Sequence, residues 1–245
     1  MAEPRVVGMI LAYNCAPMLA RAVSRIPREY LSDVFLTDDG STDGTREEAR
    51  RLGVAVIGHS PNRGYGGNVK AGLKHALSLG ADYVVEIHGD GAQFNPAAIE
   101  QALPLIDSGY DFILGSRFQR PLQALAHGMP IARWLANQGL SFFDRLVLHL
   151  PLTEFHTGFR IYSRRLIETV PYTSNADDYL FSFQIIAQAA YSRLKIGEVP
   201  VEADYHSAHT SHAMAGAAFY AVRTFGTLGQ YVLARRGLRH NVLFP

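Results

Sequence analysis

The first half of the chain alternates short apolar runs with longer stretches in which apolar residues recur at helical spacing. The apolar runs predict strands over residues 6–11, 34–37, 54–57, 83–87 and 111–115. The stretches between them predict helices over residues 16–26, 43–52, 67–79 and 96–106. Strands that are continuously apolar and separated by helices are typical of a parallel sheet covered on both faces. We therefore predict an α/β fold with a mostly parallel central sheet flanked by helices.

The second half is less regular. It predicts a loop over residues 121–130, helices over 131–150 and 177–191, and strands over 159–163 and 196–205. No internal repeat or flexible linker divides the chain, so we predict a single domain. Right-handed crossovers place the loops after the parallel strands at one edge of the sheet, where open α/β folds bind ligands.

The last part of the chain predicts an amphipathic helix followed by basic residues. Its apolar residues are Phe219, Val222, Phe225, Val232 and Leu233, and the basic ones are Arg235, Arg236 and Arg239. Arg223 lies near the middle of the apolar stretch, where an arginine costs roughly 2.5 kcal/mol or more in a bilayer, so we do not predict a membrane span. Two alternatives follow: the helix rests on a membrane surface, or it packs on its own domain.

The composition excludes two classes of protein, a disordered chain and a nucleic-acid-binding protein. The 245 residues are 48% hydrophobic, which is enough for a packed core and excludes a disordered chain. Lys and Arg number 23 against 22 Asp and Glu, so the chain lacks the basic excess of a nucleic-acid-binding protein. The single cysteine, Cys15, cannot form an internal disulfide, and we expect a cytoplasmic protein.

The loops after the second and third predicted strands carry candidate ligand groups. Residues 38–45 read DDGSTDGT, and acidic side chains at the end of a strand accept hydrogen bonds from a base or a ribose. Residues 62–67 read NRGYGG, which allows a close approach of the backbone to an anion, with Lys70 on the first turn of the next helix. The competing interpretation is ordinary turn and cap chemistry. The absence of GxGxxG after the first strand and of a P-loop motif argues against those two nucleotide sites.

The loop after the fourth predicted strand reads HGDGAQ over residues 88–93 and is the most specific signal. A carboxylate after a buried strand can hold a divalent cation that bridges a diphosphate. Asp90 is the expected ligand, with His88 or Gln93 as further ligands. The alternative, a helix cap, is weaker because the next predicted helix begins several residues later.

Together these loops resemble family 2 glycosyltransferases of the GT-A type, most closely the polyprenyl-phosphate branch that includes the dolichyl-phosphate mannosyltransferases. The matching segments are AYN at 12–14, DDGSTDGT at 38–45, NRGYGG at 62–67, GSRF at 115–118, HTGFRIYS at 156–163 and IGEVPV at 196–201. The resemblance implies a GT-A, Rossmann-like domain over residues 1–212. A nucleotide-sugar half covers 1–118 and an acceptor half covers 119–212, while 213–245 form the amphipathic helical segment.

The resemblance implies an inverting transfer of a sugar from a nucleotide diphosphate, assisted by Mg²⁺ or Mn²⁺. The implied donor contacts are Ala12, Tyr13, Asn14, Asp39, Gly66, Lys70, Gly89, Asp90 and Arg117. The implied acceptor contacts are His156, Arg160, Tyr205 and His209. Among these, Tyr13 and Asp39 would bind the nucleoside, Arg117 the donor phosphates and Arg160 the phosphate of the acceptor. A guanidinium and a metal would stabilise the charge that develops on the leaving nucleotide.

The chain departs from the family pattern at several positions. His88 replaces the first Asp of the usual Asp-x-Asp, and one extra residue separates Asp90 from Gln93. Asp204 stands where many relatives carry Arg or Lys, and histidines follow it at positions 206, 209 and 212. Ser182 stands where relatives often have an Asp that can serve as a base.

The catalytic base depends on the acceptor. A lipid phosphate is already an anion and needs no base, whereas a sugar hydroxyl needs a carboxylate to accept its proton. Glu154 and the pair Asp177-Asp178, at the start of a predicted helix, are the candidates. Charges that favour a helix N-terminus are the alternative interpretation of the pair.

We consider three functions. The leading hypothesis is a glycosyltransferase that acts on a polyprenyl phosphate at the cytosolic face of a membrane, contacting the bilayer through the C-terminal helix. The second is transfer to a carbohydrate or small-molecule hydroxyl, and the third is a catalytically silent protein that binds sugar nucleotides. GDP-mannose, UDP-glucose and UDP-N-acetylglucosamine all fit as donors, and a homo-oligomer is compatible with the sequence.

Overall fold

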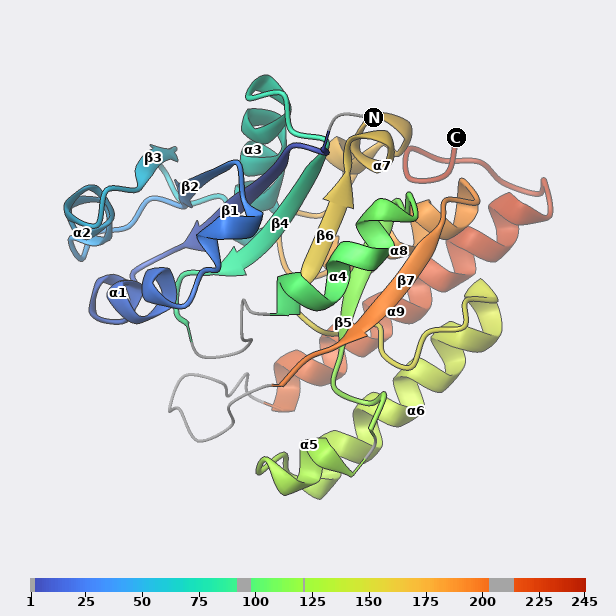
Figure 1. The fold of residues 1–245 in the computed structure, drawn as a ribbon. Coiled ribbons are helices and arrows are strands. Elements are labelled where there is room, and N and C mark those ends of the chain that lie inside the picture. The colour runs from blue at the N-terminus through green and yellow to red at the C-terminus, as the bar shows by residue number, and fades with distance from the viewer. Residues whose placement is uncertain (1–2, 92–97, 121, 203–213) are drawn as a thin grey trace.

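The computed structural model describes residues 3–91, 98–120, 122–202 and 214–245. The described residues form one seven-stranded sheet in the order β3-β2-β1-β4-β6-β5-β7 (Figure 1). The strands are β1 (Val6–Ala12), β2 (Asp33–Asp38), β3 (Ala55–Gly58), β4 (Tyr83–His88), β5 (Phe112–Ser116), β6 (Arg160–Ser163) and β7 (Ile196–Pro200). All pairings are parallel except those of β6, which runs antiparallel to β4 and β5. The predicted α/β class and mostly parallel sheet are confirmed.

Helices cover both faces of the sheet. They are α1 (Ala16–Ser24), α2 (Thr45–Arg51), α3 (Gly64–Ser78), α4 (Ala98–Asp107), α5 (Gln123–Ala126), α6 (Ile131–Leu148), α7 (Arg164–Thr169), α8 (Phe181–Tyr191) and α9 (Met214–Arg235). Alternate side chains of β1 face opposite layers: Met9 packs in the core with α3 and α8, and Ile10 packs in the core with α1 and α4. Because both faces are buried, the strands read as continuous apolar runs rather than as an alternating pattern.

Three predicted boundaries are wrong. The segment predicted as a loop over 121–130 contains the short helix α5. Helix α3 begins at Gly64 rather than at residue 67, so Lys70 lies in its second turn. Helix α8 begins at Phe181, so the Asp177-Asp178 pair precedes it instead of opening it. The reason is a long-range contact, because the carbonyl of Asp177 accepts a hydrogen bond from the amide of Gly66 and takes no part in the helix.

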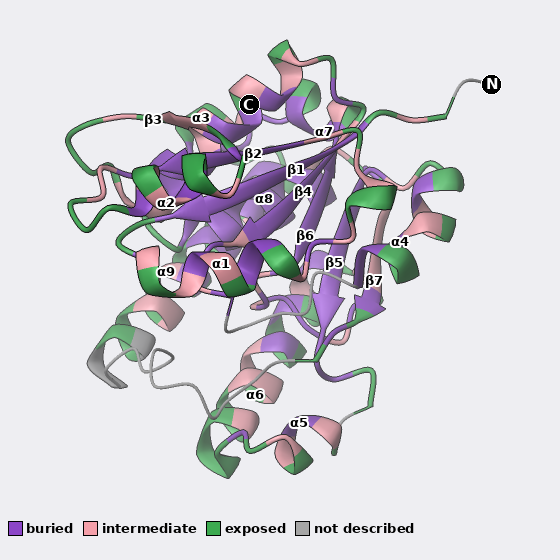
Figure 2. Cartoon of the chain, turned by 60° about the vertical axis from the view of Figure 1, so that its left-hand side comes forward, coloured by how far each residue is buried: buried purple, intermediate pink, exposed green. Residues whose placement is uncertain are grey.

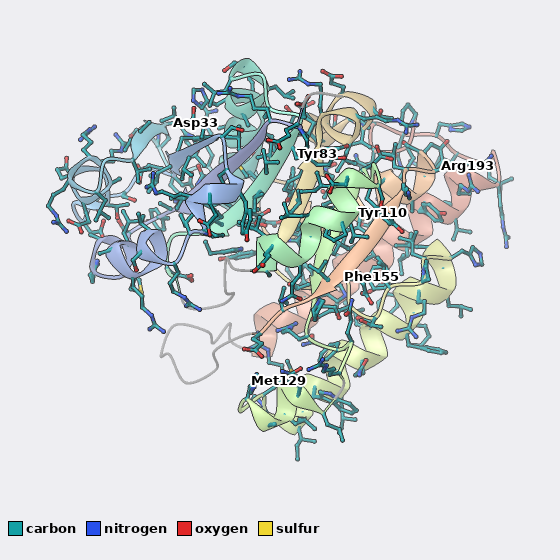
Figure 3. All side chains as sticks on the ribbon, viewed as in Figure 1. Asp33, Tyr83, Tyr110, Met129, Phe155 and Arg193 are labelled. Carbon is teal, nitrogen blue, oxygen red and sulfur yellow. The ribbon has the colours of Figure 1, made fainter. Side chains whose placement is uncertain are left out.

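Helices α5, α6 and α9 extend beyond the layer that covers the sheet, with α6 packed on α9 (Figure 1). In Figure 2 the inner strands of the sheet are mostly buried and the edge strands β3 and β7 are mostly not, while α5 and α6 carry many exposed residues. Phe118, Ala124 and Met129, the last labelled in Figure 3, form a small apolar cluster at the α5–α6 junction. Among the described helices, none combines the length and hydropathy that crossing a bilayer requires.

The sheet topology selects one edge for ligands. Tyr83, the first residue of β4, lies in the upper part of Figure 3, so the carboxyl ends of the parallel strands lie at the opposite edge. The order in which strands are added to the sheet reverses there, between the parallel neighbours β1 and β4, and open α/β sheets bind ligands at such a position. Because β6 is antiparallel, its first residue, Arg160, reaches this edge as well.

Candidate active site

The ends of β1 and β2 form one interlocked loop pair. Ala12 and Asp38 are register partners, and the amide of Asp39 donates to the Ala12 carbonyl at 2.9 Å. Asn14 adopts a left-handed conformation with φ of 46°, which its side chain supports by accepting from the Thr42 amide at 2.9 Å. Tyr13, at the tip, is 54% exposed. The predicted nucleoside-binding residues therefore belong to a loop pair that is held by hydrogen bonds between its own residues.

Asp39 is buried and already hydrogen-bonded. Its Oδ1 atom accepts from the amide of Arg63 at 2.7 Å and lies 2.7 Å from Nε2 of His59. The neighbouring Asp38 pairs with Nε of Arg46 at 2.5 Å. These bonds hold the DDGSTD loop against the glycine-rich loop of residues 62–67, so two of the predicted motifs meet.

The N-terminal turn of α3 binds another segment of the chain. The amides of Gly66 and Gly67 donate to the carbonyl of Asp177 at 2.7 and 3.3 Å. Lys70 donates to the carbonyl of Asn175 and, at 2.8 Å, to Oδ1 of Asp177. The residues predicted to approach the donor thus hold the segment before α8, and this segment was not expected to be their partner.

Asp90 lies half-buried just past the end of β4. Gly89 permits this position, because its amide donates to the Leu11 carbonyl at 2.8 Å and a Cβ there would lie 2.9 Å from the same oxygen. Nε2 of His88 lies 3.1 Å from the carbonyl of Gly158 and 3.4 Å from Oε1 of Glu86. A carbonyl only accepts, so Nε2 carries a proton in this arrangement, and a metal contact through Nδ1 of His88 stays a prediction.

The described residues fit a cation that is shared with a diphosphate. They contain no cluster of three or more His, Cys, Asp or Glu side chains that could hold a metal alone. Asp90 supplies one carboxylate, and Mg²⁺ characteristically binds one or two carboxylates together with substrate phosphates and water. Gln93 was also predicted as a ligand, but it lies outside the described residues.

A largely buried polar cluster surrounds Glu86, next to His88, and the sequence reasoning missed most of it. Glu86, in the middle of β4, accepts from the Tyr65 hydroxyl at 2.5 Å and from the hydroxyl of Tyr162. Arg160 lies 3.9 Å from Glu86 and donates to Tyr65 at 3.3 Å. Burial alone would lower the pKa of His88, but the hydrogen bond and charge of Glu86 outweigh it and raise that pKa. A lone carboxylate within an apolar strand was the available sequence signal.

The cluster places Arg160 away from solvent. Its side chain is 2% exposed, and its Nε has no hydrogen-bond partner among the described residues. Burial would lower the pKa of Arg160, but its partners, led by Tyr65 and Tyr162, raise it, so the guanidinium stays charged. In this arrangement Arg160 is bound to protein groups, and its predicted contact with an acceptor phosphate stays a prediction.

Arg117 follows β5, whose last residue Ser116 lies at the level of His88 in the sheet. Two Arg117 groups, the backbone amide and Nε, donate to Glu154 at 2.8 and 2.9 Å, and its Nη2 donates to the same carboxylate. Both side chains are buried. A buried carboxylate with both oxygens bonded to a guanidinium is an orienting group, so Glu154 is poorly placed to accept a proton from a substrate.

Asp178 is the other candidate base, and its side chain is 51% exposed. Its Oδ2 pairs with Arg223 of α9, and its Oδ1 accepts from the Leu180 amide at 3.0 Å. The next residue, Tyr179, stacks on Tyr65 with ring centroids 5.1 Å apart. Burial, followed by the charge of Asp90, raises the pKa of Tyr179, which links this segment electrostatically to the expected metal ligand.

His156 was predicted to contact the acceptor, but its ring is occupied by protein groups. Nε2 lies 2.8 Å from Oδ2 of Asp144 in α6, and Nδ1 lies 3.1 Å from the Tyr220 hydroxyl in α9. The ring also stacks on Phe183 at 5.7 Å between centroids. The remaining predicted acceptor residues, Tyr205 and His209, lie outside the described residues.

Comparisons with known proteins agree with this geometry. The family model described as Glycosyl transferase family 2 matches residues 9–170. The chain belongs to glycosyl transferase family 2. It is therefore a glycosyltransferase, and the resemblance drawn from its loops is confirmed.

Two curated relatives indicate the branch of the family. The glycosyltransferase is 29% identical over 233 residues to UDP-N-acetylglucosamine–dolichyl-phosphate N-acetylglucosaminyltransferase from Methanococcus voltae, covering 88% of this chain and 90% of the relative. It is 28% identical over 247 residues to undecaprenyl-phosphate mannosyltransferase from Micrococcus luteus, covering 96% of this chain and the whole relative. Both relatives are named for polyprenyl-phosphate acceptors.

A solved structure supports the fold. Glucosyl-3-phosphoglycerate synthase from Mycobacterium tuberculosis, in complex with Mn²⁺, UDP-glucose and phosphoglyceric acid, superposes with a TM-score of 0.69. The sequences are 16% identical, and the match covers 97% of this chain and 82% of the synthase chain. At this identity the likeness concerns the fold, which is the GT-A arrangement expected for the glycosyltransferase.

Proposed function

We propose that the enzyme transfers a sugar, with inversion, from a nucleotide-diphosphate sugar to a polyprenyl phosphate at a membrane surface. The observation that carries this proposal is the convergence of loops at the carboxyl edge of the sheet. There the ends of β1, β2, β4 and β5 bring Asp39, Asp90 and Arg117 to one side of the molecule. A nucleotide-diphosphate donor requires this combination: a polar site for the nucleoside, a ligand for a cation and a guanidinium for the phosphates.

On the donor side, Tyr13 and Asp39 bind the nucleoside, and Asp90 holds Mg²⁺ or Mn²⁺ against the diphosphate. The cation supplies a Lewis acid that offsets charge on the leaving nucleotide. Arg117 adds a guanidinium that Glu154 keeps in a fixed orientation. A hydrogen-bonding group that is already oriented stabilises the transition state most effectively, because it need not reorganise as the charge develops on the leaving nucleotide.

On the acceptor side, the two named relatives and the surface of helices α6 and α9 support a lipid phosphate. Helices α6 and α9 pack on each other and carry large exposed apolar side chains, two of which, Phe143 and Phe225, are in ring contact; we call these side chains the α6–α9 face. Its members are Ile131, Leu135, Phe142, Phe143, Leu146, Phe219, Val222, Phe225 and Leu233. An amphipathic surface of this kind can bind at a bilayer interface, where the acceptor resides.

The alternative acceptor is a hydroxyl group, and the exposure of Asp178 favours keeping it as a second candidate. A phosphate oxygen attacks as an anion, so the first function needs no base, whereas a hydroxyl must lose a proton to a carboxylate such as Asp178. The variant Asp178→Asn separates the two. We expect it to retain most of its activity toward a polyprenyl phosphate and to lose about 100-fold or more toward a hydroxyl acceptor that uses this base.

The test is a donor panel of GDP-mannose, UDP-glucose and UDP-N-acetylglucosamine with Mn²⁺ or Mg²⁺. Each donor is incubated with undecaprenyl phosphate in detergent, and both the released nucleotide diphosphate and the glycolipid are measured. We expect one donor to give glycolipid, with an anomeric configuration opposite to that of the donor by NMR. Absence of glycolipid with every donor, while a soluble sugar acceptor gives product, would replace the first function by the second.

A further inference from the structure

Residues 153–159 connect the groups that the proposed reaction uses. Thr153 hydrogen-bonds to Ser116 at the end of β5, at 2.6 Å between hydroxyl oxygens. The next residue, Glu154, holds Arg117, and the carbonyl of Gly158 accepts from His88. This segment, called here the connecting segment, therefore fixes both the guanidinium and the strand end that precedes Asp90.

The centre of the connecting segment is held by two helices of the α6–α9 face. Asp144 is fully buried in α6, and its carboxylate accepts from Nε2–H of His156. Nδ1 of the same ring lies 3.1 Å from the hydroxyl oxygen of Tyr220 in α9, which is hydrogen-bond distance. One imidazole thus joins α6 and α9 to the connecting segment.

The bond between Asp144 and His156 is hard to replace by another hydrogen bond. Oδ1 of Asp144 is buried and has no hydrogen-bond partner among the described residues, so within that part of the chain His156 is the partner of this carboxylate, through Oδ2. A buried carboxylate that loses its partner is strongly unfavourable, which resists any separation of α6 from the segment. The ring is also confined sideways, between Phe183 at 5.7 Å and Tyr220 at 5.6 Å.

We propose that Asp144 and Tyr220 are positioning residues. They act through His156 to hold the connecting segment in place, and this segment in turn fixes the positions of Arg117 and His88. This inference rests on the proposed function for its kinetic consequence. It also gives His156 a role different from contact with the acceptor. A displacement of about 1 Å in a catalytic group can cost 100-fold in rate, so these distant contacts matter to the reaction.

The experiment compares Tyr220→Phe and Asp144→Asn with the wild-type enzyme. The matched control is Tyr231→Phe, because Tyr231 is a buried tyrosine of the same helix that packs against Tyr191 and Phe244, away from the connecting segment. Amide hydrogen exchange is measured for residues 153–159, and kcat and KM are measured with the donor and the polyprenyl phosphate. Titration calorimetry with the nucleotide diphosphate and Mn²⁺ gives the fraction of enzyme molecules that bind the nucleotide. These molecules are the functional sites to which kcat is referred.

We expect faster exchange in residues 153–159 for both test variants, by about 10-fold, and unchanged exchange there for the control. We expect kcat per functional site to fall by about 10- to 100-fold in Asp144→Asn, with the KM of the donor changing less than threefold. A purely structural role would lower the number of functional sites or the melting temperature and leave kcat per site unchanged. That result, or unchanged exchange in both variants, would overturn the inference.

The two proposals fail differently. If the wild-type enzyme makes no glycolipid, the proposed function fails, and the exchange measurement still decides whether Asp144 and Tyr220 hold the segment. If the wild-type enzyme is active and Tyr220→Phe matches Tyr231→Phe in both exchange and kcat, the positioning role is wrong. Tyr220→Phe removes one oxygen atom, so it keeps the test informative if Asp144→Asn does not fold.

Discussion

Asp90 is the single described carboxylate that we expect to contact the metal, and its substitution tests the donor site directly. Asp90→Asn keeps the shape of the side chain and removes its charge. We expect kcat to fall by about 1,000-fold or more, because the cation contributes several kcal/mol to the stabilisation of the leaving group. Glycolipid formation is measured over a range of Mn²⁺ concentrations.

The matched control for this variant is Asp107→Asn, an exposed carboxylate at the end of α4. It should leave kcat within about twofold of the wild-type value, because surface substitutions away from special features have small effects. Removing the metal from the wild-type enzyme with a chelator should abolish activity, and Mn²⁺ should restore it. Full activity of Asp90→Asn would contradict the assigned metal ligand.

Cys15 gives a second prediction about a single residue. Burial raises the pKa of its thiol from 9.0 to about 11, so the folded enzyme holds less of the reactive thiolate at any pH below that value. A shift of this size lowers the thiolate fraction about 100-fold near pH 8. We expect iodoacetamide to modify the native protein at least 100-fold more slowly than the protein in urea, as followed by mass spectrometry.

Residue by residue, the sequence predicted the types of group better than their partners. Asp39 and Asp90 follow strands, and the residues that follow parallel strands meet at one edge, so their placement could be foreseen. The carboxylate near Arg160 is 74 residues away in the sequence, and the one that binds Arg117 is 37 residues away. The two partners of His156 are at least 12 residues away. Pairings over such separations depend on the tertiary fold, which periodicity and motifs do not specify.

At the scale of elements, the contact between α3 and the segment before α8 can be tested with a glycine. A Cβ on Gly66 would lie 2.3 Å from the carbonyl oxygen of Ala176 and 2.9 Å from the Asp177 carbonyl carbon. Gly66→Ala should therefore lower the free energy of unfolding by about 1–3 kcal/mol, because backbone must move to admit the methyl group. Urea unfolding followed by circular dichroism measures the change.

Gly139 is the matched control, because it also lies within a helix, α6, but a Cβ there meets nothing within 4 Å. Gly139→Ala should raise the free energy of unfolding by about 0.5–1 kcal/mol, since alanine loses less backbone entropy than glycine in a helix. Equal effects of the two substitutions would mean that the α3 contact does not depend on close approach.

Elements with strong periodicity were predicted with nearly correct bounds, as for β1, β4 and α6. The errors fall where a long-range contact overrides a local preference. Asp177 and Asp178 have the charge of a helix N-terminus, but the carbonyl of Asp177 serves α3 and Asp178 pairs with Arg223 of α9. A boundary that is set by another helix is not encoded in the local pattern.

At the scale of the whole molecule, the α6–α9 face predicts binding to anionic membranes. Asp144 is the one acidic side chain between residues 122 and 150, and it is buried, while residues 214–245 contain no Asp or Glu. Helices α6 and α9 therefore carry basic residues and no exposed acidic residue besides these apolar side chains, which suits a negatively charged lipid surface. We expect sedimentation with vesicles containing phosphatidylglycerol, and weaker sedimentation with phosphatidylcholine alone.

Substitution of the face tests this surface. Phe142 and Phe225 are 56% and 46% exposed, so Phe142→Glu and Phe225→Glu should fold and should each weaken vesicle binding by about 10-fold or more. Val242→Glu is the control, because Val242 is 71% exposed and lies outside the face. If all three variants bind vesicles as the wild type does, the face has a different role.

The position of β6 also governs how the chain can be assembled. Strand β6 comes after β5 in the sequence but lies between β4 and β5 in the sheet, so residues 1–118 cannot join β4 to β5 without it. During synthesis β5 emerges before its neighbour β6 exists, and it must wait for about 45 further residues. Sheet closure of this kind is late and slow, because distant segments must meet before they are stabilised. We therefore expect residues 1–118 and 119–212 to fold as one cooperative unit, which neither a truncation nor a gene fusion between them should preserve.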